Sequence, residues 1–280
     1  MLASLLLATA LLLGPTEPDT TLRLLPGGRV EIESHQRNIT LRTREGDMVT
    51  VRGGEAERDG RTIQVVVDDP SRPSANTLEV VVPTWARVTL SSLNGNVVVE
   101  GVPDYLHAES FNGSIRTTGG AGTLELETVT GEVTVNDFRG KRLTVDATSD
   151  NVTVNGATGR VEVTSVNGAV RLRRIRSSHV EASTVNGPVE FDGPLTADGH
   201  YTFDSHNGGI TLTLPADVSA RLMVSTFGGD FKSQIPATRA ADNKNDDPND
   251  FTVLLGKGSG ARITVGSFNG SVRVNRAGAS

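Results

Sequence analysis

Apolar and polar residues alternate along most of this chain in short runs that keep a fixed relation to a recurring Ser/Thr-Φ-Asn-Gly unit, where Φ is an apolar residue. With the glycine of each unit as origin, the positions seven and five residues before it are apolar in every repeat. The positions two and four residues after it are apolar except at Thr117 and Ser233. Since residues two apart share one face of a strand, each repeat predicts two half-buried strands joined at Asn-Gly.

The repeat units return at a nearly constant spacing. Successive origins lie 18, 18, 19, 18, 19, 21, 21 and 41 residues apart, which is typical of a repeat architecture. The origins, including one Asp that replaces the glycine, are Gly95, Gly113, Gly131, Asp150, Gly168, Gly187, Gly208, Gly229 and Gly270.

Two architectures can be built from such units. In an antiparallel meander, Asn-Gly forms a type I′ hairpin turn. In a parallel β-solenoid, the same dipeptide supplies a left-handed residue that bends the chain at a corner. We favour the solenoid, because stacked coils superimpose identical corner residues and predict an asparagine ladder with a rise of about 4.8 Å per coil. A Ser/Thr ladder is expected beside it, and turn chemistry alone is the alternative explanation of Asn-Gly.

The two ends depart from the repeat. Residues 29–42 align with residues 160–173 and are interpreted as a degenerate first coil. Residues 48–51, 62–67 and 77–82 are strand-like runs between turn signals and predict hairpins that cap one end. Residues 236–250 are polar and predict a mobile loop, after which the last repeat closes the stack.

The predicted fold is all-β, a parallel β-solenoid (β-helix) of about ten coils with an N-terminal β-hairpin cap. Its period is 18–21 residues. The predicted organisation is a signal peptide at residues 1–18, the first coil and cap at 19–84, and the solenoid at 85–276 with its insertion at 236–250.

The signal peptide is predicted from an apolar run at residues 5–13 that is followed at once by Gly14 and Pro15. A retained membrane anchor is the alternative, but a bilayer-spanning helix needs about 20 apolar residues. No second apolar stretch is long enough to cross a membrane. The mature chain is therefore expected to be exported, as a periplasmic, cell-envelope or secreted protein without a transmembrane span.

The charge of the chain argues against a nucleic-acid partner, and its lack of cysteine excludes disulfide bonds. The net charge of −6 is spread along the chain, so the basic patch of a nucleic-acid-binding protein is missing. The chain has no cysteine, so stability must come from the core and not from disulfides.

The repeat resembles a known family. Ser-Φ-Asn-Gly-x-Val-x-Val units, a preceding Val82-Pro83 pair and the sequence Gly-Lys-Gly-Ser-Gly at residues 256–260 are similar to the adhesin-like β-strand repeat family of exported or membrane-associated bacterial proteins. The likeness covers roughly residues 27 to 275. It implies a parallel β-solenoid in the cell envelope that is not an enzyme, and it carries over no catalytic, binding or cofactor residues.

One outward column offers candidate chemistry. Four residues before the origin, Glu109, Glu127 and Asp146 fall on consecutive coils, with Asp204 further along. Carboxylates stacked at about 5 Å repel one another. We therefore hypothesise that this acidic stripe binds a divalent cation or a basic partner, although a solvent-screened surface is the favoured interpretation. The histidines have no metal-ligand spacing, and a structural or surface role is favoured for His35, His107, His179, His200 and His206.

The remaining motifs have ordinary explanations. Residues 256–260 predict a turn and not a phosphate loop, and Ser267 belongs to the repeat and not to a nucleophile elbow. Residues 242–250 lack the central Gly and final Glu of a calcium loop. An arginine cluster could meet an anionic glycan or phospholipid headgroup, but pairing with Glu162, Glu181 and Glu190 is favoured; its members are Arg171, Arg173, Arg174 and Arg176.

These observations favour a non-enzymatic, adhesin-like scaffold that presents a rigid binding surface to an envelope or cell-surface protein or glycan. No cofactor is expected. A carbohydrate-active β-helix enzyme of the polysaccharide lyase or hydrolase type is the first alternative. It is disfavoured by short loops and by the scarcity of aromatic residues to stack on sugars. An envelope signalling accessory is the second.

Overall fold

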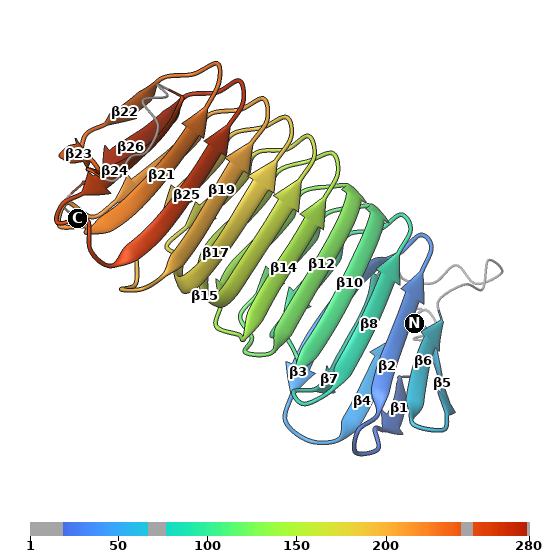
Figure 1. Ribbon diagram of the computed structural model, residues 1–280. Helices are drawn as coiled ribbons and strands as arrows, with labels where there is room; N and C mark the ends of the chain where they lie inside the picture. Colours follow the sequence, from blue (N-terminus) through green and yellow to red (C-terminus); the bar gives the residue numbers. More distant parts are fainter. Residues whose placement is uncertain (1–18, 67–76, 242–248, 279–280) are drawn as a thin grey trace, which may run out of the picture.

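The computed structural model describes residues 19–66, 77–241 and 249–278. The predicted signal peptide, part of the predicted cap and most of the predicted insertion lie outside the described residues. Within those ranges the protein is all-β and contains no helix. Figure 1 shows a row of strands stacked along one long axis, with a second row behind it.

The strands form two sheets, which are joined by β15 because this strand runs from one to the other. In spatial order, sheet A contains β1 (Thr20–Arg23), β4 (Met48–Arg52), β7 (Thr77–Pro83), β3 (Asn38–Arg44), β9 (Val97–Glu100), β11 (Ile115–Thr118), β13 (Val133–Phe138), β15 (Val152–Ser165), β16 (Val170–Arg173), β18 (Val189–Asp192), β20 (Ile210–Leu214), β26 (Val272–Arg276) and β22 (Phe231–Ser233). Sheet B contains β5 (Glu55–Asp59), β6 (Thr62–Val66), β2 (Arg29–Ser34), β8 (Arg87–Ser92), β10 (Tyr105–Asn112), β12 (Thr123–Thr130), β14 (Arg142–Ala147), β15, β17 (Arg176–Thr184), β19 (His200–Ser205), β25 (Ala261–Ser267), β21 (Ala220–Thr226), β24 (Asp250–Leu255) and β23 (Ala237–Arg239).

Each repeat contributes one strand to sheet B and, after the Asn-Gly corner, one strand to sheet A. Neighbouring repeats pair in parallel and in register, so that Val88 lies opposite Leu106 and Leu106 opposite Leu124. Parallel pairing of successive repeats excludes the antiparallel meander for this region and gives a β-solenoid-like fold.

The core lies between the two sheets and is filled by the inward half of each alternating pattern. The apolar columns before and after the corner are buried, and the largest buried side chains are Phe138, Phe191, Tyr201 and Phe203. Burying one such side chain contributes about 1.5–3 kcal/mol. Phe191 contacts Tyr201 and Phe203 across the two sheets, with ring centroids 5.9 and 5.1 Å apart.

The Asn-Gly corner does not use a left-handed glycine, so this part of the prediction is wrong. Of the origin glycines, only Gly131 has a positive φ, of 139°. Glycine is required there because of close stacking: a Cβ on Gly187 would lie 2.2 Å from the Gly168 carbonyl oxygen. The left-handed residues occupy the opposite corner instead, as one column that comprises Gly101, Gly119, Asp137, Gly156 and Arg174.

The corner carries both of the expected ladders. Asn186 donates to Asn167 Oδ1 and accepts from Asn207 Nδ2, each over 2.8 Å, and Asn269 donates to Asn207 over 2.8 Å. The Ser/Thr column is buried beside it, and Ser205 Oγ donates to the Gly187 carbonyl over 2.8 Å. Where these bonds form, they tie neighbouring coils together at the same point.

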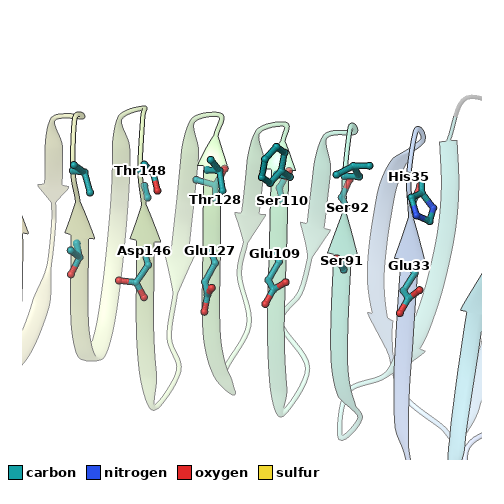
Figure 2. Close-up of a pocket in the computed structure, with 17 residues that line it drawn as sticks. Glu33, His35, Ser91, Ser92, Glu109, Ser110, Glu127, Thr128, Asp146 and Thr148 are labelled. Atoms are coloured by element: carbon teal, nitrogen blue, oxygen red, sulfur yellow. The ribbon is translucent and has the colours of Figure 1, made fainter.

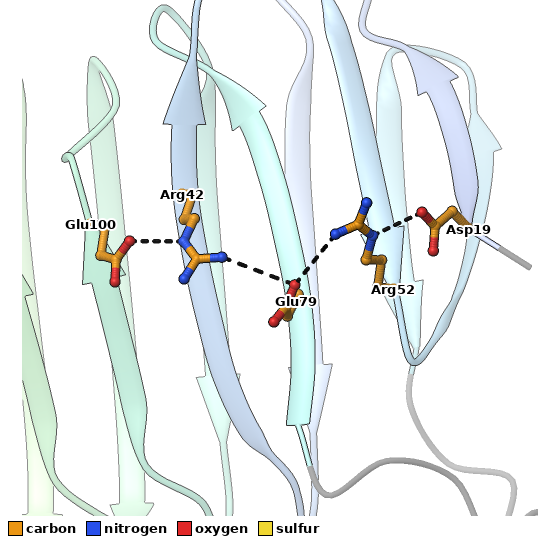
Figure 3. Close-up of polar contacts among 5 residues, drawn as sticks. All are labelled: Asp19, Arg42, Arg52, Glu79 and Glu100. Atoms are coloured by element: carbon orange, nitrogen blue, oxygen red, sulfur yellow. Dashed lines mark hydrogen bonds and ion pairs between the residues drawn. The ribbon is translucent and has the colours of Figure 1, made fainter. Parts of the chain in front are cut away.

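The N-terminal end is more solenoid-like than the predicted β-hairpin cap. β6 and β7 pair in parallel with β2 and β3, and so form an outermost coil on the far side of the first one. Antiparallel strands β5, β4 and β1 then cover this coil. A row of alternating charges crosses sheet A here (Figure 3): Arg42 pairs with Glu100 and Glu79, and Arg52 pairs with Glu79 and Asp19.

The C-terminal end differs from the expected closure by the last repeat. The last strands, β25 and β26, lie between the β19–β20 coil and the β21–β22 coil, with parallel pairing on both sides. The outermost coil is therefore the penultimate one in sequence. β23 and β24, which the sequence had placed partly in a loop, add antiparallel strands that cover β21.

Candidate functional site

The acidic stripe of Glu109, Glu127 and Asp146 lies on the outer face of sheet B. The three residues occupy directly paired positions on β10, β12 and β14. Figure 2 shows their carboxylates side by side, and Glu33 on β2 lies in the same column beyond Ser91. The structure thus brings the predicted stripe together, and adds Glu33 to its column. Asp204 shares the column farther along, next to Gly266.

An exposed apolar ridge runs parallel to the stripe, and the sequence analysis missed it. It consists of the Φ residues of the repeat, which lie two residues after the stripe positions and so project from the same outer face, as Phe111 does beside Glu109 on β10. Their exposed fractions range from 39% at Val129 and Val166 to 71% at Phe227. Thr148 and His206 interrupt the column. The ridge residues are Leu93, Phe111, Val129, Val166, Val185, Phe227 and Phe268.

A groove of about 600 Å³ lies between the stripe and the ridge. Glu109, Glu127 and Asp146 line one side of it (Figure 2). The ridge residues Phe111 and Val129 also belong to its lining. The groove crosses the strands and extends over six neighbouring coils, from β2 to β15. A surface with carboxylates along one wall and apolar side chains along the other suits a partner that is both apolar and cationic.

The ridge ends in an aromatic stack near the C-terminal end. His206 lies over Phe268 with centroids 4.9 Å apart, and Phe268 lies over Phe227 at 5.2 Å, with the rings nearly parallel. Phe268 can occupy the middle only because β25 is inserted between β19 and β21. His206 is therefore the end ring of this stack, on the β19 side. Although aromatic residues are scarce in the sequence, Phe227 and Phe268 of this stack are exposed.

A histidine joins the stripe. His107, Glu109 and Glu127 each offer one ligand atom, and these atoms all lie within 4.8 Å of one another. His107 Nε2 lies 2.9 Å from Glu109 Oε1, and its Nδ1 lies 3.7 Å from Glu125 Oε2. The absence of linear metal-ligand spacing concealed this cluster, because Glu127 comes from the next coil. The signal available in the sequence was a histidine two residues from the stripe on the same strand face.

Two carboxyls of the column have raised pKa values. Partial burial in the groove wall raises the pKa of Asp146, and the nearby Glu162 carboxylate raises it further. For Asp204, partial burial again acts first, and Glu181 adds to it. Both side chains therefore hold a proton to higher pH than an exposed aspartate does. Their ionised forms are disfavoured in the folded protein.

The other candidates lie apart from this groove. Of the arginine cluster, Arg171 pairs with Glu190 over 3.6 Å, and Arg174 lies 3.8 Å from Asp137 instead of the expected partners. His179 and His200 stack on neighbouring strands of sheet B. Residues 256–260 connect β24 to β25, and the Ser267 hydroxyl donates to the Gly208 carbonyl over 3.0 Å. Residues 242–248 lie outside the described residues.

Three solved structures resemble this chain remotely. A "putative lipid binding protein" from Parabacteroides distasonis has 10% identity and a TM-score of 0.48, with 92% of this chain and 96% of the other covered. A "putative adhesin" from Bacteroides fragilis has 10% identity and a TM-score of 0.44 over the same shares. A "putative cell adhesion protein" from Clostridium sporogenes has 7% identity and a TM-score of 0.22, with 93% and 99% covered. At these TM-scores none of them supports a functional conclusion.

Comparison with protein families gives a direct sequence match, whereas comparison with curated proteins gives none. No curated protein matches the sequence significantly. Within the described ranges, no helix has the length and hydrophobicity of a bilayer-spanning segment. The model of the family described as Toastrack DUF4097 matches residues 27–275, which is nearly the whole repeat region. The chain therefore belongs to the Toastrack DUF4097 family, in agreement with its resemblance to the adhesin-like repeat proteins.

Proposed function

We propose that this protein is an exported, non-enzymatic β-solenoid of the cell envelope, adhesin-like, which binds a partner along the outer corner of its coils. The observation that carries the proposal is the apolar ridge. Apolar side chains at this position are exposed on one repeat after another, although each could be polar without disturbing the core. Exposed apolar surface of this extent on a folded protein marks interaction sites.

The groove favours a protein partner with basic and apolar side chains. Its carboxylate wall attracts lysine or arginine, and its ridge offers hydrophobic contact. The coils of 18–21 residues hold both walls on paired strands, so little ordering is needed on binding. Membership of the family and the apolar stretch at residues 5–13 support an envelope location.

The proposal predicts that ridge substitutions abolish capture of a partner. The chain from residue 19 is immobilised and exposed to the native envelope fraction, alongside a Phe111→Ser/Phe268→Ser variant. We expect the wild-type chain to retain a defined protein and the variant to retain at least tenfold less, because both contacts are exposed and apolar. Met223→Ser is the matched control, since Met223 is equally exposed on sheet B but outside the ridge.

Equal capture by the ridge variant and the control would refute the ridge as the binding surface. Capture of no protein by the wild-type chain, together with no binding on a glycan array, would refute the binding function itself. A glycan array run in parallel separates the partner classes: binding of a glycan without capture of any protein would replace the protein partner with a carbohydrate one. Circular dichroism confirms that both variants keep the strand content of the wild type.

A further inference from the structure

The cluster of His107, Glu109 and Glu127 is the only group of three potential metal ligands within 4.8 Å among the described residues. His107 and Glu109 are two apart on β10 and so share its outer face. Glu127 is the paired neighbour of Glu109 on β12. The parallel register therefore places one imidazole and two carboxylates together on a rigid surface.

In the described part of the chain, Glu109 and Glu127 have no lysine or arginine as an ion-pair partner. Among the described ion pairs, the sole partner of Glu109 is His107. By contrast, Glu79, Glu100 and Glu190 elsewhere on the solenoid face arginines. Like charges directly opposite one another in a sheet are destabilising. A bound cation would remove this repulsion.

The imidazole of His107 is held so that one nitrogen faces the carboxylates. Nε2 points to Glu109, whereas Nδ1 is buried, without a hydrogen bond, and faces Glu125 at 3.7 Å. Glu125 in turn accepts a hydrogen bond of 2.7 Å from the Tyr105 hydroxyl. In the tautomer with its proton on Nδ1, the N–H faces the Glu125 carboxylate. The lone pair of Nε2 is then free to bind a metal ion. Metal-binding histidines usually donate their other ring N–H to a carboxylate, a backbone carbonyl or a water.

We propose that His107, Glu109 and Glu127 form a binding site for a divalent transition metal of the zinc type. Three protein ligands of mixed nitrogen and oxygen character with room for water suit Zn²⁺. Ca²⁺ instead wants six to eight oxygen ligands, and two carboxylates provide too few. The site goes beyond the proposed function, because it requires no protein partner.

The test is calorimetric titration of the chelator-treated protein with ZnCl₂ and, separately, CaCl₂. We expect one saturable Zn²⁺ site per chain and at least tenfold weaker binding in His107→Gln and in Glu127→Gln. Calcium binding should be at least tenfold weaker than zinc binding. The matched controls are His179→Gln and Glu181→Gln, because this pair has the same two-residue spacing on the outer face of β17 without belonging to the cluster. They should bind Zn²⁺ as the wild type does.

Several results would overturn the site. These are the lack of a saturable Zn²⁺ isotherm in the wild type, unchanged affinity in both cluster variants, or an equal loss in the controls. Circular dichroism of each variant excludes misfolding as the cause of a loss. Repeating the envelope capture in chelator keeps the two proposals separate: partner capture without metal leaves the binding function intact even if the zinc site fails.

Discussion

At the residue scale, position in the coil decides how a side chain behaves more than residue type does. Glu100 and Asp204 are both acidic and both lie on outer strand faces. Hydrogen bonding and charge from Arg42 lower the pKa of Glu100, whereas partial burial and the nearby Glu181 raise the pKa of Asp204. The ionised form is favoured in one case and disfavoured in the other. The two residues therefore contribute to stability with opposite signs.

Asp204→Asn should raise the free energy of unfolding at pH 7. With its pKa raised, the folded state binds more protons than the unfolded state between the ordinary aspartate pKa of about 3.9 and the raised value. The free energy of unfolding of the wild type thus falls as pH rises through that window. The neutral amide of the Asp204→Asn variant avoids this loss. Below the window the variant and the wild type should be equally stable. Urea unfolding at several pH values between 3 and 7 measures this.

Glu100→Gln is the control of opposite sign. Its carboxylate is stabilised by Arg42 in the folded state, so removing the charge should lower stability at pH 7 and have no effect once the carboxyl is protonated. An Asp204→Asn variant that is less stable than the wild type at pH 7 would contradict the assigned cause.

At the element scale, the corner is where neighbouring coils approach most closely. The origin glycines stack backbone on backbone, and a Cβ on Gly113, Gly208 or Gly270 would lie within 2.2 Å of the neighbouring carbonyl oxygen. The Asn and Ser/Thr ladders add side-chain bonds at the same corner. This stacking explains why glycine recurs there although the φ angles do not demand it.

Gly187→Ala should destabilise the protein by about 1–3 kcal/mol, because the new methyl overpacks against the Gly168 carbonyl. Gly228→Ala is the matched control from another corner, since its Cβ would meet no atom nearer than 3.3 Å. Its effect should be clearly smaller. Midpoints of urea unfolding give the comparison. If both variants unfold at the same urea concentration, close stacking is not the reason for glycine at the origin.

At the scale of the whole molecule, the first and the last coil in sequence are not the outermost coils of the stack. Each lies one coil in from its end. The first coil, β2 and β3, lies between the β6–β7 coil and the β8–β9 coil. The last coil, β25 and β26, is enclosed in the same way. Antiparallel strands then cover both strands of the outermost coil at the N-terminal end, and β21 of the outermost coil at the C-terminal end. Such coverage limits the open edges that promote aggregation.

Deleting residues 257–280, which removes β25 and β26, should therefore lower the free energy of unfolding more than the loss of an outermost coil would. Among the described strands, β22 pairs in sheet A with β26 alone, and β25 joins β19 to β21. Without them the β19–β20 coil and the β21–β22 coil each lose a neighbour, so we expect lower stability and self-association through the exposed edges. Urea unfolding and size-exclusion chromatography with light scattering measure both effects.

Deleting only residues 278–280, which follow β26, is the control and should change neither property. A monomeric protein of wild-type stability after removal of residues 257–280 would show that the enclosed coil does not hold the end together.

Local alternation predicted the strands and their buried faces well, because the side chain of every second residue points to the same side. The residues at the apolar columns, such as Val161 and Val163, are buried as expected. The candidate site was predicted less completely. The acidic stripe follows from counting back from the glycine, but the Φ residues Phe111 and Phe268 were attributed to the repeat and not recognised as exposed. The two-residue period places Phe111 on the same outer face of β10 as Glu109, so this exposure could have been predicted.

The sequence by itself determined which residues face inward, which stack at the corner and which carboxylates share a column, since all of these follow from the two-residue period of a strand. Only the tertiary structure decided the order of the coils at both ends, the conformation of each corner, and the meeting of His107 with Glu127. These features depend on which strand pairs with which, and a coil offers its neighbours nearly the same edge wherever it lies in the sequence.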